Sequence, residues 1–434
     1  MHYRECRTAE SGIGMQFYLT PADGTGGRLK ISPDDFIVRE ISSHPEPKDD
    51  GRYVIAEVTA RNWETNRLIR IMSRSLGVSR ERIGFAGTKD KRAVTTQLMS
   101  FEMPIGNLER LDLKDVSIRD AYTARRGIRI GDLVGNSFEI RVGECDADRD
   151  AIEEILEAVA GGIGGIGGFP NYFGVQRFGV IRPVTHTVGE HIVRGDLEAA
   201  VRTYLSSPSE YEDEAVISVR ERMVTGDDWN GFVRDMPDSM SFERTLAQHL
   251  AENPDDWRGA IGALPRNLQM MFVHAYQSYL FNLMLSGRMA AGLPLDSPVA
   301  GDTVIPLDAN GIPLHENPVI ASSRNLDLVE RQVRAGRAYV AISLFGSEST
   351  IADGEMGDIE REVIREAGVD REDFIVPGLG HCSSKGSHRE IVCPVRDLNH
   401  RIDDDGYTVS FSLPKGNYAT CLMREFMKSE MENY

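Results

Sequence analysis

The amino-acid sequence predicts an α+β protein in which one sheet-based domain is interrupted by a long insertion. Runs of β-branched and aromatic residues predict strands at 35–41, 53–59, 137–142 and 407–413, while apolar residues at helical spacing predict a buried helix over 267–286. The last strand lies far from the others along the chain. If it pairs with them in one sheet, most of the chain before it is an insertion into that sheet domain.

The distribution of charge supports the same division. The 434 residues carry 49 Lys and Arg against 67 Asp and Glu, a formal net charge of −18 that excludes a generally basic nucleic-acid coat. Residues 191–380 hold 16 basic and 31 acidic side chains, or −15, and the rest of the chain holds −3. Residues 61–100 hold nine basic and three acidic side chains. An anionic partner can dock on this stretch, although a solvated helix face is the other interpretation.

A helix is predicted over 63–76, capped by Asn62 at its start and ended by Gly77. A basic stripe made of Arg67, Arg70 and Arg74 occupies one face of this helix. The apolar positions, on another face, are Leu68, Ile69, Met72 and Leu76.

Cysteine usage and hydropathy predict where the protein is found. Five cysteines, an odd and sparse set, are typical of a reducing compartment, and the N-terminus lacks the apolar core of a signal peptide. The uncharged stretches 158–176 and 267–287 are interrupted by glycines or by polar side chains, so neither is predicted to span a membrane. We therefore expect a cytoplasmic protein without a membrane partner.

Two glycine-rich segments look like phosphate-binding loops but lack the required context. Segment 162–167 fits the G-x-G-x-x-G pattern, yet it follows a predicted helix over 151–160, whereas a dinucleotide-binding loop follows a strand and opens a helix. We interpret it as a flexible connector. Segment 84–89 lacks the spacing and the Lys-Ser/Thr ending of a phosphate loop.

Four soft ligands, His381, Cys382, His388 and Cys393, fall within 13 positions. Zinc ligands usually occur in pairs two to four residues apart, and the adjacent His381 and Cys382 do not easily complete a tetrahedral set. We expect no metal here and interpret the segment as a polar loop at an active cleft or a domain junction. Within it, Arg389 suits a phosphate or backbone contact.

Two further segments carry candidate chemistry. Asp90 lies between Lys89 and Lys91 on a Gly-containing turn, and flanking cations favour the ionised carboxylate that a nucleophile or a general base requires. On spacing alone, ordinary turn chemistry explains this Asp better. Segment 171–179, Asn-Tyr-Phe-Gly-Val-Gln-Arg-Phe-Gly, has the aromatic and Arg side chains that stack on RNA bases, or else forms a buried core turn.

Four ordered motifs together resemble the TruD family of pseudouridine synthases. They are Gly-Phe-Ala-Gly-Thr-Lys-Asp at 84–90, the segment 171–179, Val-His-Ala-Tyr-Gln-Ser-Tyr-Leu-Phe-Asn at 273–282, and Leu-Pro-Lys-Gly-Asn-Tyr-Ala-Thr at 413–420. The resemblance extends from about residue 30 to about residue 425 and therefore covers nearly the whole chain.

The resemblance implies a pseudouridine-synthase catalytic domain, with a mixed, mostly antiparallel sheet flanked by helices, interrupted by a large α/β family-specific insertion. The expected parts are a catalytic domain of residues 1–184 and 391–434 and an insertion of residues 185–390. The implied reaction converts uridine to pseudouridine in tRNA, mainly at uridine 13 of the D arm, without a metal or organic cofactor. The sequence does not determine the oligomeric state, although a monomer is compatible with it.

The family's catalytic aspartate falls on Asp90, with Lys89 expected to hold its charge or to contact phosphate. Phe173 matches the position whose ring packs beside the target base, and Asn171 the partner that orients Asp90. The resemblance also places Lys30, Phe36 and Phe411 in the cleft. Asp90 either attacks C1′ or removes the C2′ proton, and the sequence does not choose between these routes.

Two other classes of protein compete with this interpretation. A non-catalytic RNA-binding protein would use the stripe of Arg67, Arg70 and Arg74, but it has no need of Asp90. Another RNA-modifying enzyme, such as a methyltransferase using 162–167, lacks the required strand before the glycines. With tRNA as the partner, we expect the acidic residues of 191–380 to repel RNA and binding to weaken as salt rises.

Overall fold

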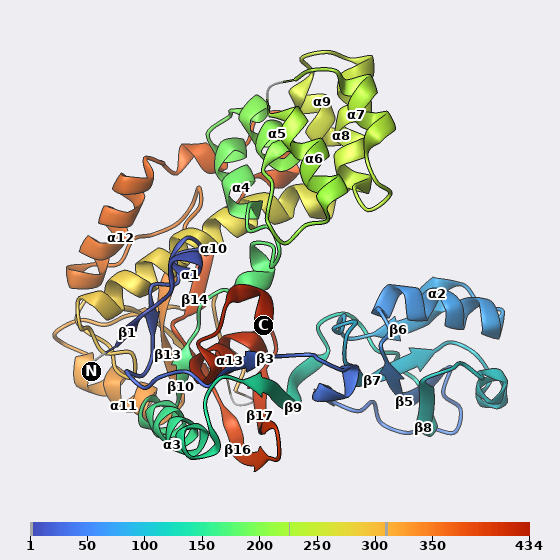
Figure 1. The fold of residues 1–434 in the computed structure, drawn as a ribbon. Coiled ribbons are helices and arrows are strands. Elements are labelled where there is room, and N and C mark those ends of the chain that lie inside the picture. The colour runs from blue at the N-terminus through green and yellow to red at the C-terminus, as the bar shows by residue number, and fades with distance from the viewer. Residues whose placement is uncertain (1–2, 225, 309–310) are drawn as a thin grey trace. The chain divides into compact units, whose positions relative to one another are not determined.

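The computed structural model describes residues 3–224, 226–308 and 311–434, and the chain forms two compact units (Figure 1). Unit 1 comprises residues 1–21, 170–392 and 430–432, and unit 2 comprises residues 22–169, 393–429 and 433–434. The predicted insertion, 185–390, falls within unit 1, together with residues 170–184 before it. Its bounds as a family-specific insertion stay a prediction.

Unit 2 is built on a nine-stranded sheet with the order β16-β17-β9-β4-β7-β5-β8, in which β3 also pairs with β9 and β6 with β7. Strands β4 and β7 are parallel and the remaining pairs are antiparallel. The strands are β3 (Gly26–Arg28), β4 (Phe36–Ser42), β5 (Tyr53–Arg61), β6 (Ile83–Phe85), β7 (Val94–Phe101), β8 (Val116–Ala124), β9 (Leu133–Cys145), β16 (Arg396–Asp403) and β17 (Gly406–Pro414).

The C-terminal strand β17 joins the N-terminal sheet, as predicted. It pairs with β9 along its whole length, and Phe411 lies opposite Phe138. Alternation explains why both segments form strands, because Phe138, Ile140 and Val142 on β9 are buried on one face. The mixed, mostly antiparallel sheet with flanking helices confirms the predicted α+β fold class.

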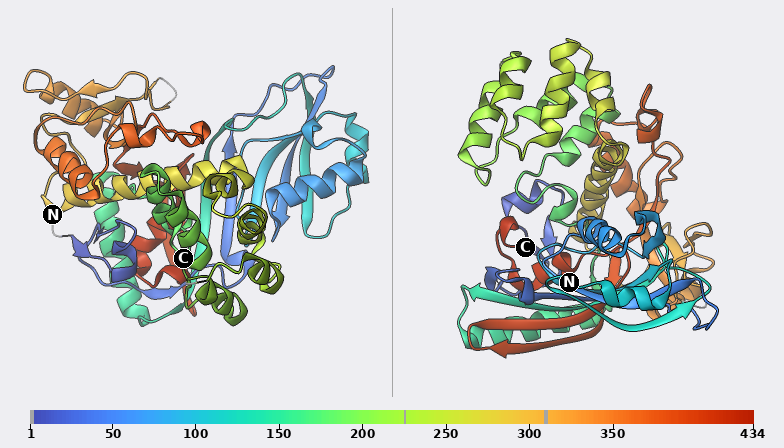
Figure 2. Two further views of the ribbon diagram at one scale, coloured as in Figure 1. Left: turned by 90° about the horizontal axis from the view of Figure 1, so that it is seen from above. Right: turned by 90° about the vertical axis from the view of Figure 1, so that its right-hand side faces the viewer.

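Helix α2 (Thr65–Leu76) packs on one face of this sheet (Figure 2). Its apolar residues contact buried residues of β5 and β7, and Gly77 ends the helix in the left-handed conformation with φ 68°. The predicted cap at Asn62 is wrong. The carboxylate of Glu64 accepts hydrogen bonds from the backbone N–H groups of Asn66 and Arg67, while Asn62 lies in the turn after β5 with φ 61°.

The glycine run is not a flexible connector, because helix α3 (Arg149–Ile166) continues through it to Gly167. Each helical glycine costs about 1 kcal/mol relative to alanine. Burial offsets that cost, since Ile163 and Ile166 continue the apolar face that Ile152 and Val159 begin. The helical spacing of these apolar residues already indicated in the sequence that the helix continues, but the glycines between them obscured it.

Unit 1 is mainly helical and is organised along α10 (Arg266–Ala290), with α4 to α9 gathered near one end of it (Figure 1). A four-stranded sheet, β12-β11-β13-β14, also belongs to this unit. Among the described residues, no helix is both long enough and apolar enough to cross a membrane. The helices are α1 (Thr8–Ser11), α4 (Thr185–Val193), α5 (Leu197–Ser206), α6 (Glu214–Met223), α7 (Trp229–Asp235), α8 (Ser241–Glu252), α9 (Trp257–Ala263), α11 (Leu326–Arg334) and α12 (Gly354–Ala367).

Short strands and one further helix complete the two units. The remaining elements are β1 (Arg4–Glu5), β2 (Phe17–Tyr18), β11 (Thr303–Pro306), β12 (Val319–Ile320), β13 (Ala338–Leu344) and β14 (Ser387–Glu390) in unit 1, β10 (Gly168–Pro170) and β15 (Val392–Pro394) where the chain passes between the units, and α13 (Ala419–Met427) in unit 2.

Candidate active site

Asp90 lies in unit 2 on the loop 86–93, which connects the antiparallel strands β6 and β7. The first glycine of the motif, Gly84, is required by packing, because a Cβ there would come within 2.2 Å of the carbonyl oxygen of Ile128. The loop is held at Lys89, whose backbone N–H donates to Thr65 Oγ1 at 2.9 Å. The sheet and the first turn of α2 therefore position the segment that carries the candidate carboxylate.

The carboxylate of Asp90 is accessible and has a cationic neighbour. Its side chain is 51% exposed, and Oδ1 lies 3.5 Å from Nζ of Lys30. The same ammonium group lies 4.4 Å from the centroid of the Phe36 ring. Lys30, Phe36 and Asp90, three residues expected in the site, are thus brought together in unit 2.

Lys30 is held in an unusual backbone conformation. Its φ of 57° lies in the left-handed region, which costs a non-glycine residue about 1–3 kcal/mol. The residue follows β3, and its side chain is 18% exposed between the Phe36 ring and Asp90. Strain of this kind tends to persist at functional sites, which agrees with a role for Lys30 beside the carboxylate.

Lys89 takes a different position from the one expected beside Asp90. Its Nζ lies 2.6 Å from Oε2 of Glu40 on β4, and the two side chains are only 5% and 1% exposed. The ammonium group is therefore committed to a buried ion pair inside unit 2. Lys30, rather than Lys89, is the lysine whose ammonium lies beside Asp90.

Phe36 and Phe411 lie on one face of the sheet and are joined by a third ring. Phe138 on β9 stacks on Phe411 with ring centroids 5.2 Å apart and meets Phe36 edge-on at 6.3 Å. Both Phe36 and Phe411 are 1% exposed. The three rings form a buried aromatic cluster, and within it the Phe36 ring contacts the Lys30 ammonium group.

Asn171 lies in unit 1 at the end of β10 and is fixed by β14. Its side-chain N–H donates to the carbonyl oxygen of Glu390 at 2.9 Å. Arg389 donates through Nε to the backbone oxygen of Asn171 at 3.1 Å and through a terminal nitrogen to Oδ1 at 2.5 Å. This forked contact matches the planar guanidinium group and a lysine cannot reproduce it.

Phe173 is fixed from both its backbone and its ring. Asn282 of α10 accepts from the Phe173 N–H at 2.9 Å and donates to its carbonyl oxygen at 3.0 Å. The Arg389 guanidinium lies 4.2 Å from the ring centroid, and the Phe281 ring meets the same ring edge-on at 5.5 Å. The motifs at 171–179 and 273–282 are therefore parts of one structural feature. The sequence suggested a phosphate or backbone contact for Arg389, and in the structure its side chain contacts the backbone oxygen of Asn171.

Asn282 also explains a glycine at the N-terminus of the chain. Its side chain donates to the carbonyl oxygen of Ile13, and a Cβ at Gly14 would come within 2.9 Å of the Asn282 Cβ. Gly14 itself has φ 80°, which only glycine adopts without strain. Nothing in the sequence connects these two positions, which are separated by more than 260 residues.

The soft ligands near residue 380 have other roles in the structure. His381 Nε2 forms a hydrogen bond with Oε1 of Gln269 at 2.8 Å, and burial raises the pKa of Cys382 to about 11, which disfavours the thiolate that metals bind. Burial, followed by electrostatic interaction with His315, lowers the pKa of His388. Among residues 3–224, 226–308 and 311–434, no group of three or more His, Cys, Asp and Glu could hold a metal ion.

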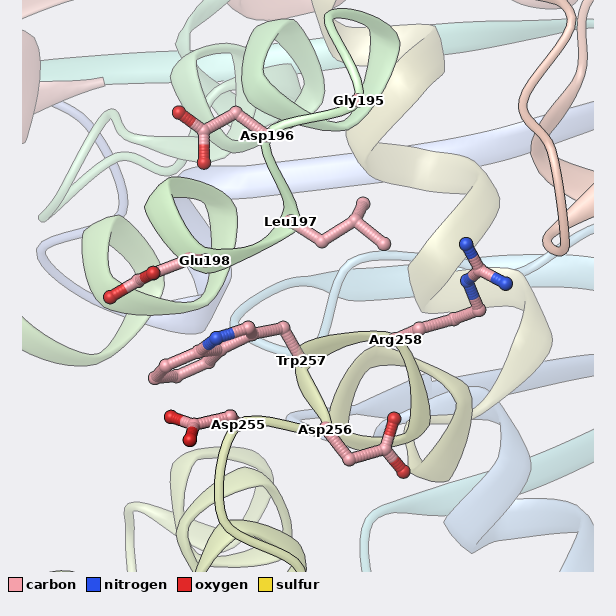
Figure 3. A pocket seen from close by; sticks show the side chains of 8 residues that line it. All are labelled: Gly195, Asp196, Leu197, Glu198, Asp255, Asp256, Trp257 and Arg258. Carbon is pink, nitrogen blue, oxygen red and sulfur yellow. The ribbon is translucent and has the colours of Figure 1, made fainter.

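A surface concavity in the helical part of unit 1 is acidic (Figure 3). Asp196, Glu198, Asp255 and Asp256 line it, and two of them are helix caps: Asp196 accepts from the Ala199 N–H and Asp256 from the Gly259 N–H. Carboxylates repel phosphate, so this concavity does not suit an RNA backbone.

The mixed, mostly antiparallel sheet is the fold expected of one class of protein, the pseudouridine synthases, and comparisons with known proteins identify that class. A family model described as tRNA pseudouridine synthase D (TruD) matches residues 12–426. The chain belongs to the TruD family and is a tRNA pseudouridine synthase, an isomerase. This excludes both a non-catalytic RNA-binding protein and a methyltransferase.

Individual relatives match over nearly their whole length. A protein named "Probable tRNA pseudouridine synthase D" from Methanococcoides burtonii is 41% identical over 97% of this chain and 97% of its own. One of the same name from Natronomonas pharaonis is 42% identical over 99% of both chains. A crystal structure of a protein described as tRNA pseudouridine synthase D (TruD), from Methanosarcina mazei, matches with a TM-score of 0.89 at 37% identity, and the match covers 99% of this chain and 100% of that chain.

Proposed function

We propose that Asp90 is the carboxylate that breaks the glycosidic bond of uridine, and that the target is uridine 13 in the D arm of tRNA. The observation that carries the first part is the position of Asp90. It is exposed on a loop that the sheet and α2 hold, with the Lys30 ammonium 3.5 Å away. The D-arm target rests on the resemblance of the four motifs to the TruD family.

Two routes are open to this carboxylate. In the first, an Asp90 oxygen bonds to C1′ while the C1′–N1 bond breaks and its electron pair leaves with uracil. The uracil then turns, C5 displaces the carboxylate from C1′, and the C5 proton is lost to solvent as N1 gains one. In the second, Asp90 removes the C2′ proton as uracil leaves, and it returns that proton to C2′ when C5 adds to the glycal at C1′; here too the C5 proton is lost to solvent and N1 gains one.

The other expected site residues receive distinct proposed roles. Lys30 balances the charge of Asp90 and is supported by the Phe36 ring, which Phe138 connects to Phe411. Lys89 positions the loop through Glu40 and does not contact phosphate. Phe173 packs beside the displaced base, and Asn171, whose side chain is held by Glu390 and Arg389, fixes the segment that carries Phe173. A stacked aromatic ring offsets part of the unstacking cost, which is a few kcal/mol.

The position of the modified uridine is tested directly on unmodified tRNA transcripts. After incubation with the protein and carbodiimide treatment, we expect one strong reverse-transcription stop, at uridine 13. A transcript with cytidine at position 13 is the matched control and should lose that stop. A strong stop elsewhere with none at position 13 would refute the proposed target while leaving the role of Asp90 open.

Arg389→Lys tests the proposed role of Asn171 and Phe173. The substitution keeps the charge but loses the forked contact with Asn171 and the flat group over the Phe173 ring. We expect kcat/KM for tRNA to fall about tenfold or more, which corresponds to a loss of about 1.4 kcal/mol of transition-state stabilisation. Lys385→Arg, at an exposed position near β14, is the control. Unchanged kcat/KM in Arg389→Lys would show that the arrangement around Phe173 is not needed for the reaction.

A further inference from the structure

The exposed face of α2 is basic and has an unusual lack of counter-charges. Arg67, Arg70 and Arg74 are all exposed, and no acidic residue lies between Thr65 and Leu76. Among the residues that the structure describes, none of these three guanidinium groups forms an ion pair within 4.0 Å, and the charge of Glu64 acts on Arg70 only at longer range. The nearest acidic residue along the chain, Glu64, uses its carboxylate to cap the helix.

This arrangement is unfavourable for the isolated protein. Arg67 and Arg70 are three residues apart and Arg70 and Arg74 are four apart, so their like charges are neighbours on the helix surface and repel each other. The exposed helix α11 shows the usual alternative, because its Arg334 is paired with Glu330 at 2.6 Å. A face of like charges without partners suits a ligand that supplies regularly spaced negative charge.

The surface beside α2 is mixed in charge, and Arg67 on α2 itself is partly pre-ordered. Two short 3-10 helices contact α2, Arg80–Arg82 and Ile105–Arg110, and they add the exposed Arg80 and Arg110 together with two exposed carboxylates, Glu81 and Glu109. The Arg67 guanidinium lies 5.6 Å from the ring centroid of Trp63, whose Nε1 donates to the Lys114 carbonyl oxygen. This stacking restrains Arg67 without neutralising it.

The same helix is joined to the loop that carries Asp90. Thr65, in the first turn of α2, is 2% exposed and accepts the backbone N–H of Lys89, the residue before Asp90. An anionic polymer bound along Arg67, Arg70 and Arg74 would therefore lie on an element that directly supports the catalytic loop. Unit 2 has a net charge of only −3, with 27 basic and 30 acidic residues, whereas unit 1 carries 22 basic and 37 acidic residues.

We propose that the exposed face of α2, formed by Arg67, Arg70 and Arg74, binds the phosphate backbone of the tRNA and so delivers the target uridine to the Asp90 loop. This inference rests on the proposed function of Asp90. It gives the arginines a role in affinity, because phosphate contacts hold and orient RNA without reading its sequence.

The test is a triple variant, Arg67→Gln, Arg70→Gln and Arg74→Gln, compared with Arg331→Gln, Arg334→Gln and Arg337→Gln in unit 1. Both variants lose three exposed positive charges, and glutamine is as good a helix former as arginine. The probe is an unmodified tRNA transcript whose dissociation constant is measured at several salt concentrations. For the α2 variant we expect at least tenfold weaker binding, a salt slope smaller by about two, and a loss of kcat/KM that lies mainly in KM. The control should stay within twofold of the parent protein.

Unchanged tRNA affinity and salt slope in the α2 variant, with an unchanged melting temperature, would overturn the proposal. Equal losses in the α2 variant and in the control would also overturn it, because they would show a general effect of net charge. Failure of the proposed catalytic role is separate: it would appear as full activity of Asp90→Asn, a variant that leaves the basic face intact.

Discussion

Asp90→Asn is expected to lower kcat at least about 10³-fold while tRNA affinity stays within about twofold. Asparagine has the same shape as aspartate, but it lacks the negative charge needed to attack C1′ and the basicity needed to remove the C2′ proton. Both routes therefore lose the reacting group. Reverse-transcription stops after carbodiimide treatment measure the reaction, and filter binding measures the affinity.

Loss of stability should not obscure this result. The Asp90 side chain is 51% exposed and that of Lys30 is 18% exposed, and a pair whose carboxylate is this accessible to solvent contributes about 1 kcal/mol or less. Asp49→Asn, which also removes one exposed carboxylate from a turn of unit 2, is the matched control and should retain full activity. Full activity of Asp90→Asn itself would eliminate the proposed mechanism under either route.

Lys89→Met is expected to lower the free energy of unfolding by about 3–5 kcal/mol, because it leaves the Glu40 carboxylate buried without its cation. Nζ of Lys89 and Oε2 of Glu40 are 2.6 Å apart, and both side chains are almost completely buried. The pair connects β4 to the loop 86–93 before Asp90. We expect activity to fall with stability, as measured by denaturant unfolding and by tRNA modification.

The double variant Glu40→Leu and Lys89→Met tests whether Lys89 only stabilises the fold or also acts on the substrate. Removing both charges often restores stability when a buried pair is replaced by apolar side chains of similar size. We expect the double variant to regain most of the lost stability and at least a tenth of the activity, while Lys91→Met, at an exposed neighbouring position, changes neither. A double variant that is stable but inactive would show that the Lys89 ammonium acts on the substrate and does not only position the loop.

The elements that sequence analysis predicted well are those in which local pattern and burial agree. Strands β4, β5, β9 and β17 alternate or are continuously apolar because one or both faces are buried, and α2 carries its apolar residues at helical spacing. The joining of the last strand to the N-terminal sheet was stated only as a condition of the insertion, and the pairing of β17 with β9 meets that condition.

The errors occurred where a local preference competes with tertiary packing. Glycines at 161–165 disfavour a helix, but the buried face that continues to Ile166 stabilises α3 through them. Asn62 is a good capping residue, yet it lies in the turn after β5, so Glu64 caps the helix instead. In both cases the local preference of the residue type is real, but packing and chain position decide whether the residue follows it.

For the candidate site too, some features could be predicted from the sequence and others only from the tertiary structure. The four motifs and Asp90 are recognisable in the sequence because the family resemblance depends on residue order. The partner of each side chain is not, because it comes from a distant segment: Lys30 lies beside Asp90, Glu40 binds Lys89, and Arg389 binds Asn171 across more than 200 residues.

The sequence by itself determined the α+β class, the family and the identity of the candidate carboxylate, since these depend on local patterns and on the order of motifs. Only the tertiary structure decided which lysine lies beside that carboxylate and which is buried against Glu40, because Lys89 and Lys30 are equally cationic and differ only in what surrounds them. It also showed that, among the described residues, the guanidinium groups of Arg67, Arg70 and Arg74 form no ion pair, which a count of charges along the chain cannot reveal.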